Sequence, residues 1–164
     1  MNIRRLEEKD AEEVSALIAE TLRTSNIRDY SVEYIERDIQ ALQPADIRQR
    51  ALWTHFYVAC AGEKIVGCGA IGPYWGRMDE SSLFTIFVLP EYQGRGIGRM
   101  IVETLEEDEY FLRAGRIEIP ASITATDFYR KMGYDYKHGL SEPDAEGLVR
   151  LEKFRRPDCD DQAD

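Results

Sequence analysis

The sequence predicts a mixed α/β fold in which helices flank a central sheet, and three observations lead to this prediction. The chain has 164 residues, an ordinary length for one domain, and 43% of them are hydrophobic, which is enough to bury a core. The hydrophobic residues recur at helical spacing at first and then, from residue 54, take a strand-like pattern. Near the middle, a buried strand, a glycine-rich turn and a helix follow in direct succession, as in α/β proteins.

The first expected elements are a short strand and a helix. Residues 2–6 form the strand candidate. Asp10, with Glu13 three residues later, resembles a capping box and predicts that a helix begins there. Four apolar residues then recur at helical spacing and predict its buried face: Val14, Leu17, Ile18 and Leu22.

A second helix is expected to begin at Ser31 and to end near Pro44, because proline disrupts the interior of a helix. Its apolar face contains Ile35, Ile39 and Leu42. The segment 43–52 is polar, and we expect a connection there that has room for another helical turn.

Strand-forming residues dominate the next part of the chain. Residues 55–61 and 64–71 are separated by a Gly-Glu pair, which is the pattern of a β-hairpin. After a loop rich in glycine and proline, residues 82–89 are apolar on both faces. Such a run is typical of a strand at the centre of a sheet.

The second half of the chain is expected to alternate helices and strands. The helix after the glycine-rich turn would bury Ile97, Ile101, Leu105 and, at its far end, Leu112. The remaining expected elements are a strand over 115–119, a helix over 124–132 closed by Gly133, and strands over 134–137 and 148–154.

A glycine-rich turn lies between the buried strand and the helix that follows it. Gly94, Gly96 and Gly98 leave the backbone free of Cβ atoms, and the first amides of the helix have no partner within it. Amides at the positive end of a helix dipole bind anions, and Arg95 and Arg99 add positive charge. The turn therefore indicates a pyrophosphate site or, as the alternative, a tight turn that needs glycine for its geometry alone.

Two known phosphate motifs fit this turn incompletely. The loop of nucleoside triphosphatases ends in Gly-Lys-Ser/Thr, whereas this chain has Gly-Arg-Met. A dinucleotide fingerprint that starts at Gly96 would place Ile101 where a small residue is needed for close packing. Glu118 lies about 20 residues further on, as a ribose-binding acid would, so a nicotinamide dinucleotide stays an alternative ligand.

Two sequence blocks resemble the GCN5-related N-acetyltransferase (GNAT) superfamily. Residues 93–98, Gln-Gly-Arg-Gly-Ile-Gly, match the pattern Q/R-x-x-G-x-G/A and follow Val-Leu-Pro-Glu-Tyr. Residues 122–134 are similar to the family's segment N-x-x-A-x-x-F-Y-x-x-x-G-F. The resemblance covers about residues 1–155 and implies the acyl-CoA N-acyltransferase fold, whose central sheet is twisted, mostly antiparallel and flanked by helices.

The resemblance also implies that acetyl-CoA is the co-substrate and that its pyrophosphate lies on the glycine-rich turn. In this family a bulge in the central strand presents backbone amides to the acetyl carbonyl and the pantetheine arm. Ser122 stands where many relatives have an asparagine near the thiol. The residues expected to contact the cofactor are Phe87, Val88, Leu89, Gln93, Gly94, Arg95, Gly96, Ile97, Gly98, Arg99 and Ser122.

Acetyl transfer to an amine needs a deprotonated amine, a stabilised oxyanion and a proton for the departing thiolate. By resemblance, Tyr129 of the Phe-Tyr pair is the expected general acid, and its neighbour Phe128 is expected to face the core. Relatives of the histone-modifying type have a glutamate where this chain has Ser82. The candidate bases are therefore Glu80, which lies two residues earlier and would act through a water, Glu118, or a chain of waters.

Charge and composition limit the partners. The net charge of −10 disfavours binding to nucleic acid or to an anionic membrane and favours a cationic amine as the acceptor. The resemblance assigns acceptor choice to residues 24–52 and to the loop 74–80. Trp53, Tyr74 and Trp75 are candidates for an acceptor pocket or, alternatively, pack against the strands.

Three cysteines without C-x-x-C spacing and two histidines indicate neither a disulfide framework nor a metal site. The N-terminus lacks the apolar run of a signal peptide, so a cytoplasmic protein is expected. We predict one domain over 1–157 and an acidic, disordered tail over 158–164, and the resemblance implies a homodimer.

Two further function classes stay open beside the acetyltransferase. Ser82 and Ser122 depart from residues common in the family, which would suit a CoA-binding sensor or interaction module with weak catalysis. A nicotinamide dinucleotide-binding protein is the other alternative.

Overall fold

A computed structural model describes residues 1–156, so the predicted tail 158–164, with Cys159, lies outside the described part of the chain. The strands are β1 (Asn2–Arg5), β2 (His55–Ala61), β3 (Lys64–Pro73), β4 (Glu80–Val88), β5 (Arg116–Ser122), β6 (Asp135–Tyr136) and β7 (Leu148–Phe154). They form a seven-stranded sheet in the order β1-β2-β3-β4-β5-β7-β6. Only the pair β4–β5 is parallel among these neighbours. This confirms the predicted mixed, mostly antiparallel sheet, with β4 at its centre.

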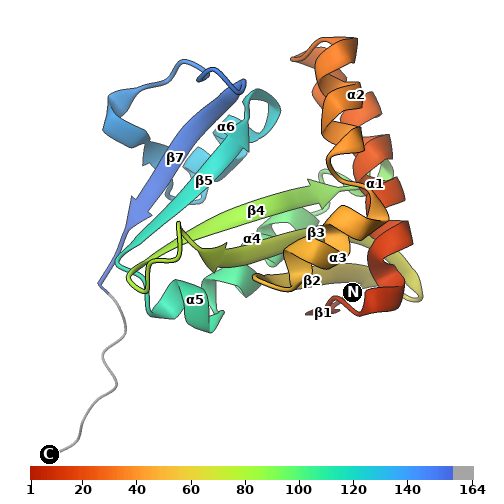
Figure 1. Cartoon of the computed structure of the whole chain (residues 1–164), viewed down its shortest axis with the longest axis horizontal. Coiled ribbons are helices and arrows are strands. Elements are labelled where there is room, and N and C mark those ends of the chain that lie inside the picture. Colours follow the sequence, from red (N-terminus) through yellow and green to blue (C-terminus); the bar gives the residue numbers. More distant parts are fainter. Residues whose placement is uncertain (157–164) are drawn as a thin grey trace, which may run out of the picture.

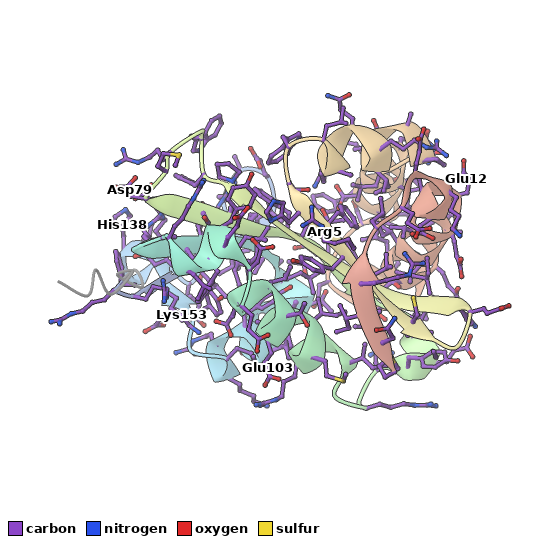
Figure 2. The ribbon with its side chains drawn as sticks, turned by 90° about the horizontal axis from the view of Figure 1, so that it is seen from below. Arg5, Glu12, Asp79, Glu103, His138 and Lys153 are labelled. Carbon is purple, nitrogen blue, oxygen red and sulfur yellow. The ribbon has the colours of Figure 1, made fainter. Side chains whose placement is uncertain are left out.

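Helices cover both faces of this sheet. They are α1 (Ala11–Thr24), α2 (Val32–Gln40), α3 (Pro44–Ala51), α4 (Ile97–Glu106), α5 (Glu109–Leu112) and α6 (Thr126–Lys131). The helices α1 and α3 lie over one face, and α4 and α5 lie over the other (Figure 1). Glu12 on α1 and Glu103 on α4 point outward on these opposite sides (Figure 2). In the described residues, no helix is long and apolar enough to span a membrane.

The start of α1 corrects one sequence expectation. Asp10 and Glu13 do not form a capping box, because both carboxylates are used elsewhere. Asp10 is buried and accepts hydrogen bonds from Arg4 Nη1 (2.7 Å) and from the Glu7 amide (2.7 Å). Glu13 accepts the Ile65 amide of β3 (2.9 Å) and so joins the helix to the sheet.

The segment after α2 is more helical than the sequence indicated. Ser31 caps α2 as expected, since its hydroxyl accepts the Tyr34 amide (3.1 Å). However, α2 ends at Gln40, and Pro44 begins α3 instead of ending a helix. Proline is favoured at a first helical position because the amide that it lacks would have no intrahelical acceptor there. The predicted connection 43–52 is therefore mostly the helix α3.

The packing of α4 on β3 depends on glycine. The stripe Ile97, Ile101 and Leu105 is buried, as predicted from its spacing, whereas Leu112 lies on the separate helix α5 and is half-buried. A Cβ atom at Gly69 would lie 2.6 Å from Ile101 Cγ2 and 3.3 Å from Leu105 Cδ1. The missing side chain on β3 thus lets α4 approach the sheet closely.

The strands β4 and β5 pair only at their beginning, and this feature positions the site. Their register runs from Glu80↔Arg116 to Ser82↔Glu118 and stops there. Beyond this point the two strands diverge, while β4 stays paired with β3 and β5 with β7 (Figure 1). The divergence opens a gap at the centre of the sheet.

We expect Gly69→Ala to lower the free energy of unfolding by about 1–3 kcal/mol, because the added methyl group overpacks the contact with α4. Urea unfolding measures this change, and an unchanged m-value checks that the same states are compared. A gain in stability, the usual effect of replacing glycine by alanine at an ordinary φ, would contradict the packing argument.

Candidate functional site

A cleft of about 970 Å³ occupies the gap between β4 and β5. Residues 83–88 of β4 and 119–122 of β5 line its inner walls. The helices α1 and α2, the first turn of α4 and the helix α6 contribute further lining residues. The cleft therefore joins segments that are far apart in the sequence.

The glycine-rich turn forms one end of this cleft. Gly94 has φ +76° and Gly96 has φ +81°, and nothing lies within 4 Å of a Cβ atom built at either residue. Glycine is thus needed here for the left-handed backbone and not for space. The first intrahelical bond of α4 runs from the Met100 amide to the Gly96 carbonyl (3.1 Å). The amides of the three residues before Met100 consequently have no acceptor within the helix.

Three side chains in or beside the glycine-rich turn differ in what they contact. Gln93 Nε2 donates to the Val88 carbonyl (3.0 Å) and to Ser25 Oγ (3.2 Å), which fixes the turn against β4 and α1. Arg99 lines the cleft, as an anion-binding residue would. Arg95 instead lies with its guanidinium 5.0 Å from the centre of the Tyr92 ring and does not line this cleft.

Both aromatic residues of the pair on α6 line the cleft, and they differ in burial. Phe128 lines the cleft, and a Cβ atom at Gly98 would lie 3.2 Å from its Cζ atom. The absent side chain at Gly98 leaves room for this ring at the start of α4. Tyr129 is the deeply buried member, with 5% of its surface exposed. Phe128 is partly buried and packs against the hydrophobic core, as predicted, and it borders the cleft as well.

A β-bulge interrupts β4 where it lines the cleft. The register with β3 shifts between Cys68 and Ala70, and Thr85 on the opposite strand has φ +54°. A positive φ is strained for a β-branched residue and occurs where the surrounding structure holds it in place. The bulge lies earlier on β4 than the expected amide-bearing residues.

Two of the three residues expected to offer amides border the cleft. Phe87 and Val88 line it. The Leu89 amide donates to the Val66 carbonyl (2.9 Å), which corrects the expectation for Leu89 because the sheet already uses that amide.

Tyr129 lines the cleft together with Ser122. Its hydroxyl makes no hydrogen bond with any residue in the described part of the chain. Burial raises the pKa of Tyr129 above its ordinary value, so the phenol stays protonated at neutral pH. A protonated hydroxyl without a competing partner can donate a proton to a bound group.

Cys68 lies near this tyrosine but is not suited to act as a nucleophile. Its Sγ atom donates to the Thr85 carbonyl (3.2 Å). Burial raises the pKa of the Cys68 thiol to about 12, which leaves almost no thiolate at neutral pH.

Sequence reasoning did not single out four charged residues that line the cleft: the exposed Arg37 and Glu146, and the partly buried Asp38 and Arg50. Arg50 Nη1 donates to Thr85 Oγ1 at the bulge (2.8 Å). In the sequence, Arg50 looks like its neighbour Arg48, which forms a surface ion pair with Glu12. No local signal separates the two arginines, because their surroundings depend on residues elsewhere in the chain.

A second cleft, of about 480 Å³, lies next to the first. The two clefts share Phe84 on β4 and Pro120 on β5. The second one contains the three aromatic residues predicted for an acceptor pocket, together with three polar residues; the six are Trp53, Tyr74, Trp75, Ser82, Glu118 and Arg150. It therefore reaches the point where β4 and β5 separate.

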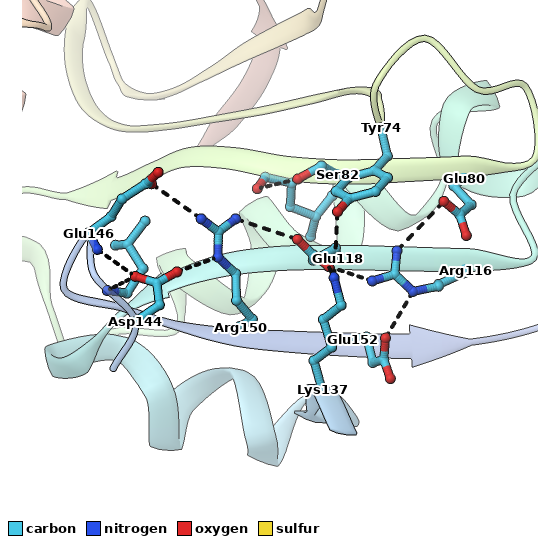
Figure 3. Close-up of polar contacts among 12 residues, drawn as sticks. Tyr74, Glu80, Ser82, Arg116, Glu118, Lys137, Asp144, Glu146, Arg150 and Glu152 are labelled. Carbon is cyan, nitrogen blue, oxygen red and sulfur yellow. Dashed lines mark hydrogen bonds and ion pairs between the residues drawn. The ribbon is translucent and has the colours of Figure 1, made fainter. Parts of the chain in front are cut away.

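Glu118 is the centre of an ion cluster at this point (Figure 3). It is 1% exposed, and Lys137 Nζ lies 2.7 Å and Arg150 Nη1 3.5 Å from its oxygens. Arg116 pairs with it as well. Burial favours the protonated form, but hydrogen bonds from Lys137 and Arg116 outweigh it and hold the pKa of Glu118 below its ordinary value. A carboxylate in this setting is a weak proton acceptor.

The remaining acidic side chains of the described residues lie outside the first cleft or are already paired with cations. Glu80 lies 3.8 Å from Arg116 and 3.5 Å from Arg77, and it lines neither of the two clefts. Glu118 borders the second cleft and not the glycine-rich turn, so its position offers no ribose contact beside that turn. Over residues 1–156, no group of three or more His, Cys, Asp or Glu side chains is placed to hold a metal ion.

Comparison with known proteins gives a family match. The model of the acetyltransferase (GNAT) domain matches residues 53–136. An amino-acid acetyltransferase from Mycobacterium tuberculosis is 30% identical, over 48% of this chain and 53% of that protein. An uncharacterized N-acetyltransferase from Chlorobaculum tepidum is 32% identical, over 48% of each. The chain thus spans about half the length of the curated relatives that it matches.

Solved structures show the same fold at low sequence identity. The PaiA N-acetyltransferase from Thermoplasma acidophilum, in complex with coenzyme A, has a TM-score of 0.78 and 20% identity, and the match covers 94% of this chain and 98% of that one. An aminoglycoside 6'-N-acetyltransferase complexed with coenzyme A has a TM-score of 0.66 and 18% identity, with 96% and 100% covered.

We expect Glu118→Gln to lower the free energy of unfolding at pH 7 by about 3 kcal/mol, because three cations lose their shared anion. A folded-state pKa below the unfolded value adds stability that is present at neutral pH and is lost as the pH falls through the folded pKa. The gap between wild type and variant should therefore narrow on acidification.

Urea unfolding at neutral and acidic pH measures this gap. Glu142→Gln, which changes an exposed carboxylate, is the matched control and should have little effect. A gap that is absent at neutral pH, or that widens on acidification, would contradict the assigned role of Glu118.

Proposed function

This chain belongs to the GNAT acetyltransferase family, and from that membership we propose that it is an acetyl-CoA-dependent N-acetyltransferase acting on a primary amine. One observation carries the proposal: a single cleft brings together the anion-binding turn, the bulged strand β4 and the Tyr129 hydroxyl. These are the three components that acetyl transfer from a phosphate-bearing thioester requires.

The residues of the cleft fit coenzyme A in chemical type. A pyrophosphate would be held by the free amides at the start of α4 and by Arg99. The pantetheine arm carries amides, which suit the edge of β4 at Phe87 and Val88, where β5 no longer pairs with it. Ser122 offers a hydroxyl on the opposite wall. Structural neighbours in complex with coenzyme A support this assignment.

Acetyl-CoA supplies an activated acetyl thioester, and the chain's residues bind and orient it beside the amine. In a ternary complex, the amine nitrogen forms a bond to the carbonyl carbon and the C–S bond breaks. The nitrogen loses one proton and the sulfur gains one, so the products are an N-acetylated amine and the free thiol of CoA. The step needs no further reactant.

Tyr129 is the proposed donor of the proton to the sulfur. Burial keeps its hydroxyl protonated, and no hydrogen bond within the described residues competes for that proton. For the amine, we propose that the proton leaves through water. The Glu118 carboxylate is neutralised by cations, and Glu80 lines neither cleft.

Titration by calorimetry with acetyl-CoA and with NAD(P) tests the cofactor class. We expect acetyl-CoA to bind and NAD(P) not to bind. A screen of primary amines that follows release of free CoA then tests turnover. Binding of NAD(P) without acetyl-CoA would contradict the proposal, and so would acetyl-CoA binding without turnover of any amine, which a sensor would show.

Gly96→Val should weaken acetyl-CoA binding about tenfold or more, because a β-branched residue is strained at φ +81° and the turn must change shape. Gly76→Val is the matched control. Gly76 also has a left-handed φ (+73°) with nothing within 4 Å of a built Cβ atom, but it lies outside the first cleft. Equal affinity losses in both variants would argue against the turn as the binding site.

Tyr129→Phe should lower kcat by roughly 10- to 10⁴-fold, the range of general acid–base contributions, and leave acetyl-CoA affinity nearly unchanged. Steady-state kinetics and calorimetry measure the two quantities. Tyr136→Phe, outside the cleft lining, should turn over like the wild type. Wild-type rates for the Tyr129 variant would remove this residue from the mechanism.

A further inference from the structure

Arg50 is a partly buried cation that forms no ion pair in the part of the chain that the structure describes. It lies in the last turn of α3 and lines the first cleft. Its one side-chain hydrogen bond runs from Nη1 to the neutral Thr85 hydroxyl (2.8 Å). Within residues 1–156, no carboxylate lies within 4.0 Å of its guanidinium nitrogens. Arg48, on the same helix, does have a carboxylate partner in Glu12.

A charge in this setting favours an anionic ligand. Burial lowers the pKa of Arg50, and the charge of Asp46 offsets only part of that effect. A guanidinium nevertheless stays protonated in proteins, so the charge persists in the partly desolvated cleft. Its five donors form a planar fork that matches a carboxylate or a phosphate, and only one of them makes a hydrogen bond within residues 1–156.

The place of Arg50 separates it from the pyrophosphate site. The guanidinium is joined to Thr85, whereas the glycine-rich turn is joined to β4 at Val88 through Gln93. Three residues of strand correspond to about 10 Å. Arg50 therefore lies at the bulge, near Cys68 and on the side of the cleft formed by the segment 24–52, which is where acceptor choice was expected.

A second charged group accompanies it. Asp38 on α2 lines the same cleft and is partly buried, and its carboxylate has no hydrogen bond or ion pair within the described residues. Burial raises the pKa of Asp38, and the exposed Arg37 beside it only partly offsets this effect. Five charged residues line the cleft: Arg37, Asp38, Arg50, Arg99 and Glu146. Arg37, Arg99 and Glu146 are exposed, whereas Asp38 and Arg50 are partly buried and form no ion pair among residues 1–156, an arrangement suited to a ligand that carries both charges.

We propose that Arg50 binds a carboxylate of the acceptor, and that the acceptor is therefore an aminocarboxylic acid. This inference rests on the proposed function, since it names the substrate class for the same cleft. An aminocarboxylic acid takes the place of the purely cationic amine that the net charge favoured. The net charge of the chain is negative, but the group beside Thr85 is the Arg50 cation.

Matched acceptors test the proposal: α-, β- and γ-aminocarboxylic acids, each beside its primary amide. With CoA release as the readout, the wild type should have a higher kcat/KM for at least one acid than for its amide. Arg50→Met should raise KM for that acid about 10- to 100-fold, the range for a lost hydrogen bond to a charged group, and change the amide little. Arg50→Lys should restore part of the loss.

Arg48→Met is the matched control on the same helix and should leave both acceptors unaffected. An equal loss for acid and amide, or weaker acetyl-CoA binding by Arg50→Met, would overturn the proposal, because Arg50 would then act in folding or in donor binding. So would a wild type that acetylates amides as well as acids. A wild type that binds no acetyl-CoA would instead refute the proposed function. If Arg50→Met does not fold, two other measurements test the proposal: the preference of the wild type for the acid over its amide, and the KM of Arg50→Lys for that acid.

Discussion

The divergence of β4 from β5 is the constraint on which the rest of the site depends. The two strands pair over three residues, up to Ser82↔Glu118, and beyond that point their facing edges have no strand partner. Backbone groups on such edges need water or a ligand as hydrogen-bonding partners. The opening is stable because β3 holds β4 and β7 holds β5 along the outer edges. The sheet therefore provides a rigid, incompletely bonded cleft without losing its continuity.

Glu118 stabilises the point at which the strands separate. Its carboxylate joins β5 to Arg150 of β7 and to Lys137 of the turn that follows β6, and Arg116 extends the cluster to Glu80 on β4 (Figure 3). A buried carboxylate with several cationic partners holds its neighbours in one geometry and is poorly suited to accept a proton. The lowered pKa of Glu118 and its burial thus both follow from its place at the centre of this ion cluster.

Charge in this protein is organised locally. The chain as a whole is acidic, with a net charge of −10, yet the cleft contains Arg99 beside the turn and Arg50 beside the bulge. Arg50 is held by a hydrogen bond to the neutral Thr85 hydroxyl, and Arg99 lies at the start of α4. Neither arginine forms a buried ion pair within residues 1–156. Arg50 contacts β4 at Thr85, whereas Arg99 lies on α4 just after the glycine-rich turn, so the cleft offers separate places for negative charge. That separation suits a phosphate-bearing donor and a carboxylate-bearing acceptor.

The sequence by itself determined the features that depend on neighbouring residues. The left-handed turn needs glycine at positions 94 and 96, and the stripe Ile97, Ile101 and Leu105 needs only helical spacing. Tertiary structure decided what depends on distant partners. Arg50 contacts Thr85, 35 residues away, and Phe128 turns to the cleft because Gly98 leaves space for it. Local periodicity specifies backbone conformation and an apolar face, whereas the burial and pairing of a polar side chain depend on which distant segment packs beside it.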